Sequence, residues 1–284
     1  MRLNQIRRGN GLPLLLLHGL GGSWGSWRRV LPLLEKKRNV IAVDLPGFGK
    51  TPALQGPVSI ESLADGLIEF LVQNDLIGVD VAGSSMGARL ALELARRGAV
   101  GATVALNPAG FWQGWEKAYF LRSLQVSVNL LRFLEPALPY LLRTRVGRTI
   151  LLAQLSARPW AVPEGLAIAE MVGCANSPSF DELLRSLVEG PPQLGIPINR
   201  PCNPIAIGWG RQDRVCFPWQ AMRALEKFPS ARMEWFEGSG HYPHWDVPQQ
   251  AANFILENTG LDIEFAKVCV GRESDGLSAR FARH

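Results

Sequence analysis

Outside a long middle stretch, apolar residues follow two patterns that alternate along the chain. Short, largely apolar runs cover residues 14–17, 40–43, 79–83, 102–106, 204–209 and 232–236. Helical spacing marks residues 23–36, 59–76, 88–97, 218–227 and 247–257. A continuous apolar run is typical of a strand covered on both faces. Strands that alternate with helices predict an α/β fold with a doubly wound, mostly parallel sheet.

Three local signals refine these elements. Pro32 lies within 23–36 and predicts a break or a late helix start there. Ser59 or Ile60 is the expected N-cap of the helix over 59–76. Residues 1–11 leave room for one strand followed by a turn at Asn10-Gly11, a dipeptide that is a strong hairpin signal when alternating residues flank it.

The strand pattern stops between residues 111 and 200, where leucines and aromatic residues recur at helical spacing. About 90 residues is long for a connection between two strands, so we expect a helical insertion. The chain then divides into an α/β core of residues 1–110 and 201–260, the insertion over 111–200, and a C-terminal appendage over 261–284. The length fits one α/β domain with an insertion better than two independent domains.

The sequence Gly83-Ser84-Ser85-Met86-Gly87 joins a predicted strand to a predicted helix. A sharp turn of this kind brings backbone segments close together, which explains glycine at both ends of the pentad. The turn exposes the hydroxyl of Ser85, and the amides at the start of the following helix can stabilise negative charge. The pentad therefore indicates a nucleophilic serine.

Four flanking motifs agree with this interpretation. They are Leu17-His18-Gly19, Asp44-Leu45-Pro46-Gly47-Phe48-Gly49, Trp209-Gly210-Arg211-Gln212-Asp213 and Gly238-Ser239-Gly240-His241. Together with the pentad they resemble the α/β-hydrolase superfamily, with serine, aspartate and histidine in that chain order. The resemblance runs from about residue 14 to residue 258 and leaves out the insertion. Members usually begin with two strands, where this chain has room for one.

The resemblance implies a catalytic triad of Ser85, Asp213 and His241. Histidine suits the role of base because its ordinary pKa of about 6.5 is near working pH. We prefer His241 to His244, because His241 ends the Gly-x-Gly-His motif and His244 falls where a helix begins. Some relatives place the acid after the 102–106 strand, but Asn107 stands there and cannot carry the charge.

An oxyanion hole is also implied, with the backbone N–H groups of Leu20 and Met86 as donors. His18 is expected to shape the loop that carries Leu20 and to take no part in proton transfer. Asp44 is expected to hold its own loop through backbone N–H groups. Asp246 reads as a helix-start residue favoured by the helix dipole.

By the same resemblance, residues 111–200 form a helical lid across the active site. Most of its apolar residues are expected to form the core of the lid, and a minority to face an apolar pocket. Arg143, Arg145 and Arg148 lie at helical spacing and are interpreted as a solvated face.

Charge and composition exclude several other classes. The formal net charge is +5, but lysines and arginines are scattered without interleaved aromatics, so we expect no nucleic-acid binding. The four cysteines have no metal-ligand spacing, which suits reduced thiols in the cytoplasm, and we expect no metal or cofactor. No run reaches the roughly 18–20 apolar residues that a membrane span needs. Residues 12–17 after Arg7 and Arg8 read as a strand and not as a signal peptide. The appendage is a candidate for self-association as a homodimer, although no motif supports this.

The expected function is hydrolysis of small or medium carboxylic esters. Carbon–carbon bond hydrolases of ring-cleavage diketones are an alternative, although they tend to have Asn and Trp where this chain has Ser84 and Tyr242. A small-molecule receptor that retains the triad is a second alternative, and a haloperoxidase-like activity is less favoured because Leu20 replaces an aromatic residue. Haloalkane dehalogenases and epoxide hydrolases use a carboxylate nucleophile, so Ser85 excludes them.

Overall fold

A computed structural model describes residues 1–197 and 202–260 of the chain. The predicted appendage over 261–284 therefore lies outside the described residues. A seven-stranded sheet with the order β1-β3-β2-β4-β5-β6-β7 runs through the molecule. Strands β2 to β7 are parallel and β1 is antiparallel to β3, which confirms the α/β fold with a mostly parallel sheet. The strands are β1 (Gln5–Arg8), β2 (Pro13–Leu17), β3 (Asn39–Val43), β4 (Asp80–Ser84), β5 (Thr103–Leu106), β6 (Ile205–Gly210) and β7 (Arg232–Phe236).

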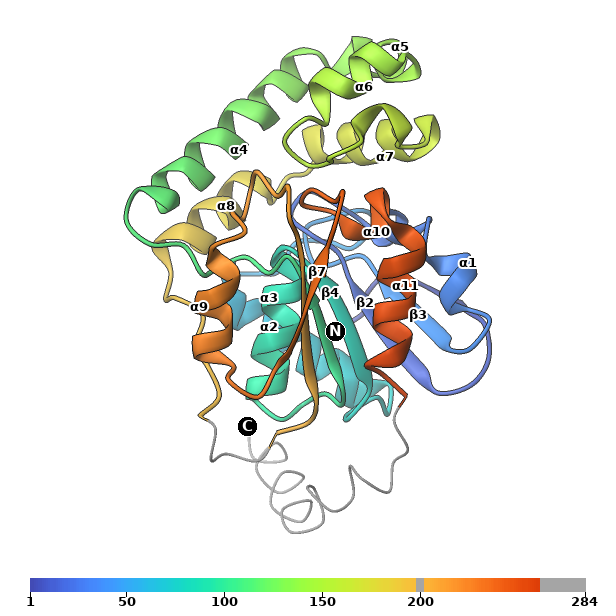
Figure 1. Cartoon of the computed structure of the whole chain (residues 1–284), viewed down its shortest axis with the longest axis vertical. Helices are drawn as coiled ribbons and strands as arrows, with labels where there is room; N and C mark the ends of the chain where they lie inside the picture. The colour runs from blue at the N-terminus through green and yellow to red at the C-terminus, as the bar shows by residue number, and fades with distance from the viewer. Residues whose placement is uncertain (198–201, 261–284) are drawn as a thin grey trace.

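Helices cover both faces of the sheet, and a further group lies beyond one end of it (Figure 1). Those of the core are η1 (Trp24–Trp27), α1 (Leu31–Leu34), α2 (Ile60–Gln73), α3 (Met86–Arg96), α9 (Gln220–Lys227), α10 (Pro243–Asp246) and α11 (Pro248–Glu257). Those of the end group are α4 (Trp115–Phe133), η2 (Glu135–Ala137), α5 (Leu138–Arg143), α6 (Arg145–Leu151), η3 (Pro159–Ala161), α7 (Glu164–Ala175) and α8 (Phe180–Glu189). We call this end group the cap.

The hydrophobic core is divided by the sheet into two clusters. Successive strand residues point to opposite faces, so Leu15 and Leu17 of β2 pack with α2 and α3, whereas Leu14 and Leu16 pack with α1 and α11. All four of these leucines are fully buried, which is why β2 reads as a continuous apolar run. The cap has its own cluster, which includes Leu138, Leu142 and Leu166.

The first strand does not form a hairpin with the second. β1 pairs with β3, and β2 lies on the other side of β3, so Asn10-Gly11 turns the chain past one intervening strand. The hairpin that this dipeptide suggested is therefore wrong. The physical reason is that β2 is buried on both faces and has β3 and β4 as parallel neighbours, which leaves the antiparallel strand only the open edge of β3.

Most of the local sequence signals predicted the starts and breaks of the helices correctly. Ser59 caps α2 through a reciprocal capping box with Ser62. The stretch over 23–36 splits into the short helices η1 and α1, with Pro32 in the first turn of α1, as its sequence predicted. The prediction that Arg143, Arg145 and Arg148 form a solvated face is wrong for Arg148. This side chain is buried and donates hydrogen bonds to the carbonyls of Leu142 and Arg143.

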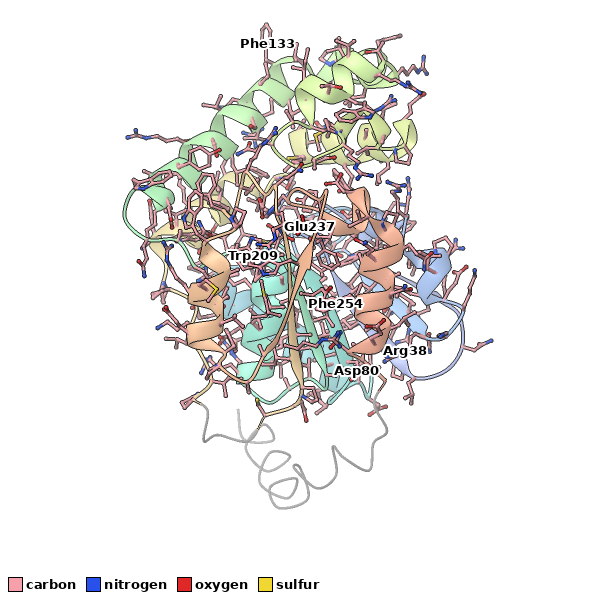
Figure 2. The ribbon with its side chains drawn as sticks, viewed as in Figure 1. Arg38, Asp80, Phe133, Trp209, Glu237 and Phe254 are labelled. Carbon is pink, nitrogen blue, oxygen red and sulfur yellow. The ribbon has the colours of Figure 1, made fainter. Side chains whose placement is uncertain are left out.

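An ion pair fastens the sheet at the end opposite the cap. Arg38 and Asp80 meet at 2.7 Å near the amino ends of β3 and β4, where Figure 2 shows them side by side. Arg38 also donates to the carbonyls of Leu12 and Pro13 at the start of β2. Because Arg38 is almost fully buried, these bonds order the amino ends of three adjacent strands.

The sharp turn between β4 and α3 requires glycine at two positions. A Cβ atom at Gly87 would lie 2.2 Å from the carbonyl oxygen of Leu17, and one at Gly83 would lie 2.2 Å from the carbonyl oxygen of Gly87. Backbone atoms cannot move aside as a flexible side chain can, so helix α3 can approach the end of β2 only without these side chains.

We predict that Gly87→Ala destabilises the protein by more than about 3 kcal/mol because of this clash. Gly173→Ala in α7 is the matched control, since its Cβ would meet no atom within 4 Å. The control should be neutral or more stable by up to about 1 kcal/mol, as expected for glycine in an exposed helix. Urea unfolding of the two variants measures the difference, and equal stabilities would contradict the close approach.

Candidate active site

Ser85 lies between β4 and α3 in a strained backbone conformation. Its φ of 56° and ψ of −116° fall where side-chain-bearing residues are rare. The surrounding backbone holds it there, because its N–H donates to Leu106 and its carbonyl accepts from Arg89 and Ala109. Strain of this kind persists only where neighbouring structure enforces it and is concentrated at functional sites.

The three residues predicted as a triad meet at the carboxyl edge of the sheet. The Ser85 hydroxyl lies 2.8 Å from Nε2 of His241, and Nδ1 of His241 lies 2.9 Å from Oδ2 of Asp213. All three side chains are buried. A carboxylate can only accept a hydrogen bond, so Nδ1 carries the imidazole proton and Nε2 is left to accept from the serine.

Asp213 is held by four hydrogen bonds. Oδ1 accepts from the backbone N–H groups of Val215 and Cys216, and Oδ2 accepts from His241 and from the side-chain amide of Asn107 at 2.6 Å. These bonds use the acceptor capacity of both oxygens and fix the direction in which the carboxylate faces the imidazole.

The role of Asn107 was missed at the level of sequence, where it served only to exclude an acid after β5. Its amide nitrogen donates to Asp213, and its amide oxygen accepts from the N–H of Gly210 at 3.2 Å. Asn107 therefore links the end of β5 to the Asp213 loop. The sequence did contain one signal for this role, since Asn107 directly follows a predicted strand. Neighbouring parallel strands end at the same edge of the sheet, so a residue there can lie close to the Asp213 loop.

Asp246 orders the loop that carries His241. Its carboxylate accepts from the N–H groups of Gly240 and Ala157 and from the hydroxyl of Ser156. Asp246 lies in the single turn of α10 and directly before the N-cap of α11, as its interpretation as a helix-start residue expected, and it also binds the histidine loop to the cap. Leu155 of the cap also holds the loop that carries His241, because its carbonyl accepts from the N–H of His241 at 2.9 Å.

The other two histidines near the site are buried and neutral. Burial lowers the pKa of His18 to about 4, and His18 receives a hydrogen bond from the N–H of Leu45 while it lies 2.7 Å from the carbonyl of Gly19. Burial, with a smaller effect from His241, lowers the pKa of His244 to about 3. His244 packs against Trp27, and within the described residues neither of its nitrogens has a hydrogen-bond partner. His18 shapes its loop, as predicted.

Asp44 also holds its loop as predicted, by accepting from the backbone N–H groups of Trp24 and Lys50. The adjoining loop carries Leu20, whose N–H has no acceptor within the described residues, and Met86 N–H is the first amide of α3. Helices leave their first amides unpaired. Neither N–H group therefore has a backbone acceptor among the described residues.

A cavity of about 210 Å³ adjoins the serine and extends beneath the cap. The core contributes Leu20, Ser85, Met86 and His241, and the cap contributes mostly apolar side chains such as Phe120, Leu124, Val128 and Leu131. The volume is below the range of roughly 300–1,000 Å³ that is usual for drug-sized ligands. The cavity suits a short or medium apolar group.

One acid, Glu170 of α7, lines this cavity and was missed in the sequence. Ser26 donates a hydrogen bond of 2.5 Å to its carboxylate, which joins the cap to η1 in the core. Burial raises the pKa of Glu170 to about 7, partly offset by hydrogen bonding to Ser26 and by the nearby Arg28. Neither spacing nor motif marks this residue, because its environment arises only when α7 packs on η1.

The donor atoms beside His241 do not fit a metal. One ligand atom each from Asp213, Cys216 and His241 lies within 4.8 Å of the others. However, N–H donors occupy both oxygens of Asp213, and burial raises the pKa of the Cys216 thiol well above its ordinary value, which disfavours the thiolate that metals require. Cys174, Cys202 and Cys216 are all free thiols.

The described residues contain no helix that is both long enough and apolar enough to cross a membrane.

We predict that Glu170→Gln increases stability at pH 8 and has little effect at pH 5. The native pKa of about 7 is above the ordinary value of 4.5, so the native state loses stability relative to the unfolded state as pH rises through this interval. The full effect is about 3 kcal/mol. Glutamine keeps an acceptor for Ser26 and removes the buried charge.

Thermal unfolding from pH 5 to pH 8 measures this effect as the Tm difference between variant and wild type. Glu226→Gln makes the same change at an exposed position of α9 and is the control. A Tm difference for Glu170→Gln that stays constant with pH would contradict the buried carboxyl group.

Comparison with known proteins agrees with this architecture. A model of the alpha/beta hydrolase family matches residues 14–254. An uncharacterized protein of Mycobacterium tuberculosis is 27% identical over 259 residues, which are 87% of this chain and 75% of that protein. A pimeloyl-[acyl-carrier protein] methyl ester esterase of Legionella pneumophila is 27% identical over 253 residues, which are 86% of this chain and 93% of that protein.

Among solved structures, a meta-cleavage product hydrolase from Pseudomonas fluorescens superposes with a TM-score of 0.65 at 22% identity, covering 90% of this chain and 93% of that one. This likeness concerns the fold. The family match spans both halves of the core and the cap between them. The chain belongs to the alpha/beta hydrolase family and is an α/β-fold hydrolase.

Proposed function

We propose that the protein is a serine hydrolase that cleaves small or medium carboxylic esters through an acyl-enzyme intermediate. The observation that carries this proposal is the continuous hydrogen-bonded series from Ser85 through His241 to Asp213, which opens into the apolar cavity. A hydroxyl is a weak nucleophile at neutral pH and needs a base placed as His241 is.

The proposed reaction has two halves. In the first, Ser85 Oγ attacks the ester carbonyl as Nε2 of His241 takes its proton, and the imidazolium is stabilised by Asp213. His241 then gives this proton to the departing alcohol. In the second half, a water molecule loses a proton to His241 and attacks the acyl-enzyme, which releases the acid and restores Ser85.

Negative charge develops on the carbonyl oxygen in both halves. The N–H groups of Leu20 and Met86 are the proposed donors to this oxygen, and each such donor contributes roughly 3–4 kcal/mol to transition-state stabilisation in a well-studied protease. Both residues line the cavity beside Ser85. The glycines of the Gly19–Gly22 stretch allow the backbone to turn these amides inward.

The cap is the proposed lid and acyl pocket. Its apolar side chains enclose the cavity and exclude water, which strengthens the electrostatic interactions at the reacting carbonyl. By its name, the esterase relative acts on a pimeloyl-[acyl-carrier protein] methyl ester, and an apolar pocket of this size fits the acyl group of a small or medium ester. No cofactor takes part in the proposed reaction.

Carbon–carbon bond hydrolysis is less well supported. Ser84 precedes the nucleophile and Tyr242 follows the histidine, at positions where the diketone hydrolases tend to have Asn and Trp. A receptor with slow turnover is the other alternative, and it would use the same cavity.

We predict that Ser85→Ala lowers kcat/KM for p-nitrophenyl butyrate by about 10⁴-fold or more, because the nucleophile is lost. Ser84→Ala is the matched control in the same turn, since the Ser84 hydroxyl is buried and has no hydrogen-bond partner within the described residues. The control should retain activity within about threefold. Steady-state assays on esters of two to ten acyl carbons measure both.

Three results would contradict the esterase proposal. Turnover that survives in Ser85→Ala would exclude the serine as nucleophile. A single slow turnover accompanied by a large thermal shift would favour the receptor. Activity on a vinylogous diketone without activity on any ester would favour carbon–carbon cleavage.

We predict that Asp213→Asn lowers kcat by about 10⁴-fold with little change in KM, because the imidazole loses its orienting carboxylate while the cavity is unchanged. The pH profile of the residual rate distinguishes this role from a structural one. A folded variant with the wild-type rate would remove Asp213 from the mechanism.

A further inference from the structure

The outer surface of the cap carries a group of exposed apolar side chains. Val126, Leu130 and Phe133 of α4 are 68%, 45% and 82% exposed, and Val146 and Ile150 of α6 are 68% and 67% exposed. Their spacings of three and four residues place each set on one stripe of its helix. We call these five residues the cap face. Figure 2 shows Phe133 projecting from the end of α4 away from the sheet.

Two residues of the cap face lie at an opening of the cavity beside Ser85. Leu130 and Ile150 line this cavity, yet each is largely exposed, so they lie where it meets solvent. The side chain of Gln154 bridges the two sides of the opening through hydrogen bonds with Ser123 and Ser127. The apolar interior is therefore continuous with the apolar exterior at this point.

Cationic side chains border the same opening. A shallow groove shares Ser127, Ala153 and Gln154 with the cavity and is also lined by the exposed residues Arg122 and Arg214. Arg214 is held there by a hydrogen bond to the carbonyl of Ala153 at 2.9 Å. No acidic residue lines the groove among the described residues.

The charges on helices α4 to α6 of the cap leave a positive excess at the surface. Over residues 115–151 the acids are Glu116 and Glu135, of which Glu116 is buried and paired with Arg223. Arg132 and Arg143 have acidic partners elsewhere in the cap, whereas the exposed Arg122 and Arg145 have none within the described residues. Two unpaired cations, Arg122 and Arg145, therefore lie on the helices of the cap face, together with the partly exposed acid Glu135.

We propose that the cap face docks on an anionic lipid surface and admits an acyl chain from it into the catalytic cavity. Apolar side chains on helices that lie in an interface, bordered by arginines, are the arrangement by which proteins bind anionic bilayers. The exposed Arg122 and Arg214 beside the opening complement anionic headgroups, which favours an anionic bilayer as the occupant. The admission of a substrate rests on the proposed esterase function, whereas the docking does not.

Docking is tested by co-sedimentation of the full chain with vesicles of phosphatidylcholine containing 30% phosphatidylglycerol. Ser85→Ala protein is used, so that binding is measured without catalysis. The double variant Phe133→Asp/Val146→Asp should lower the partition coefficient at least tenfold. Ile77→Asp is the matched control, because Ile77 is 51% exposed and precedes β4 at the opposite end of the sheet, and it should bind as the parent protein does.

Binding should also weaken as salt is raised and when phosphatidylglycerol is omitted, because arginines bind the anionic headgroups. Absence of binding by the parent protein at low salt, or equal binding by the double variant, would overturn the proposal. A dimer in light scattering that the double variant abolishes, without vesicle binding, would overturn it in favour of contact with a second copy.

A kinetic comparison separates docking from the esterase proposal. With the active chain, the double variant should hydrolyse soluble p-nitrophenyl butyrate at the wild-type rate, because neither Phe133 nor Val146 lines the cavity. It should hydrolyse a p-nitrophenyl ester of a ten-carbon acyl chain carried in the same vesicles at least fivefold more slowly. Equal losses on both substrates would contradict a docking role.

Discussion

The close approach of α3 to the end of β2 is the constraint on which the site depends. Gly87 has no side chain, so its backbone can lie against the carbonyls of Leu17 and His18. This contact places the first amide of α3 beside the loop that carries Leu20, and it fixes the strained turn at Ser85. The proposed nucleophile and both proposed oxyanion donors are therefore positioned by one backbone contact between a helix and a strand.

A polar network then brings His241 and Asp213 to this turn. Asn107 at the end of β5 and the backbone amides after Asp213 orient the carboxylate, while Asp246 and the carbonyl of Leu155 hold the histidine loop. Two of these partners involve the cap, since Leu155 belongs to it and Asp246 binds Ser156 there. The cap is thus part of the support of His241 as well as a cover for the cavity.

The sequence predicted most of the fold because local patterns determine it. The buried run at 14–17, the capping residue Ser59 and the glycines around Ser85 each have a local physical cause that the structure repeats. The family motifs also named the three side chains that meet at hydrogen-bond distance.

What the sequence did not predict depends on contacts between distant segments. Glu170 becomes a buried acid only when α7 packs on η1, and Asp246 reaches the cap across a long separation in the chain. The hairpin expected at Asn10-Gly11 was wrong because the pairing of β1 is decided by which strand has an open edge. Arg148 was misread because spacing alone does not distinguish a solvated arginine from one that donates to buried carbonyls.

The central claim is that His241 activates Ser85 for covalent chemistry. Labelling with a fluorophosphonate, followed by intact-mass analysis and peptide mapping, tests it most directly. The account predicts a single adduct on the peptide that contains Ser85, and a labelling rate at least a hundredfold lower in folded His241→Ala protein. An adduct on another residue, or equal labelling rates in the two proteins, would contradict it.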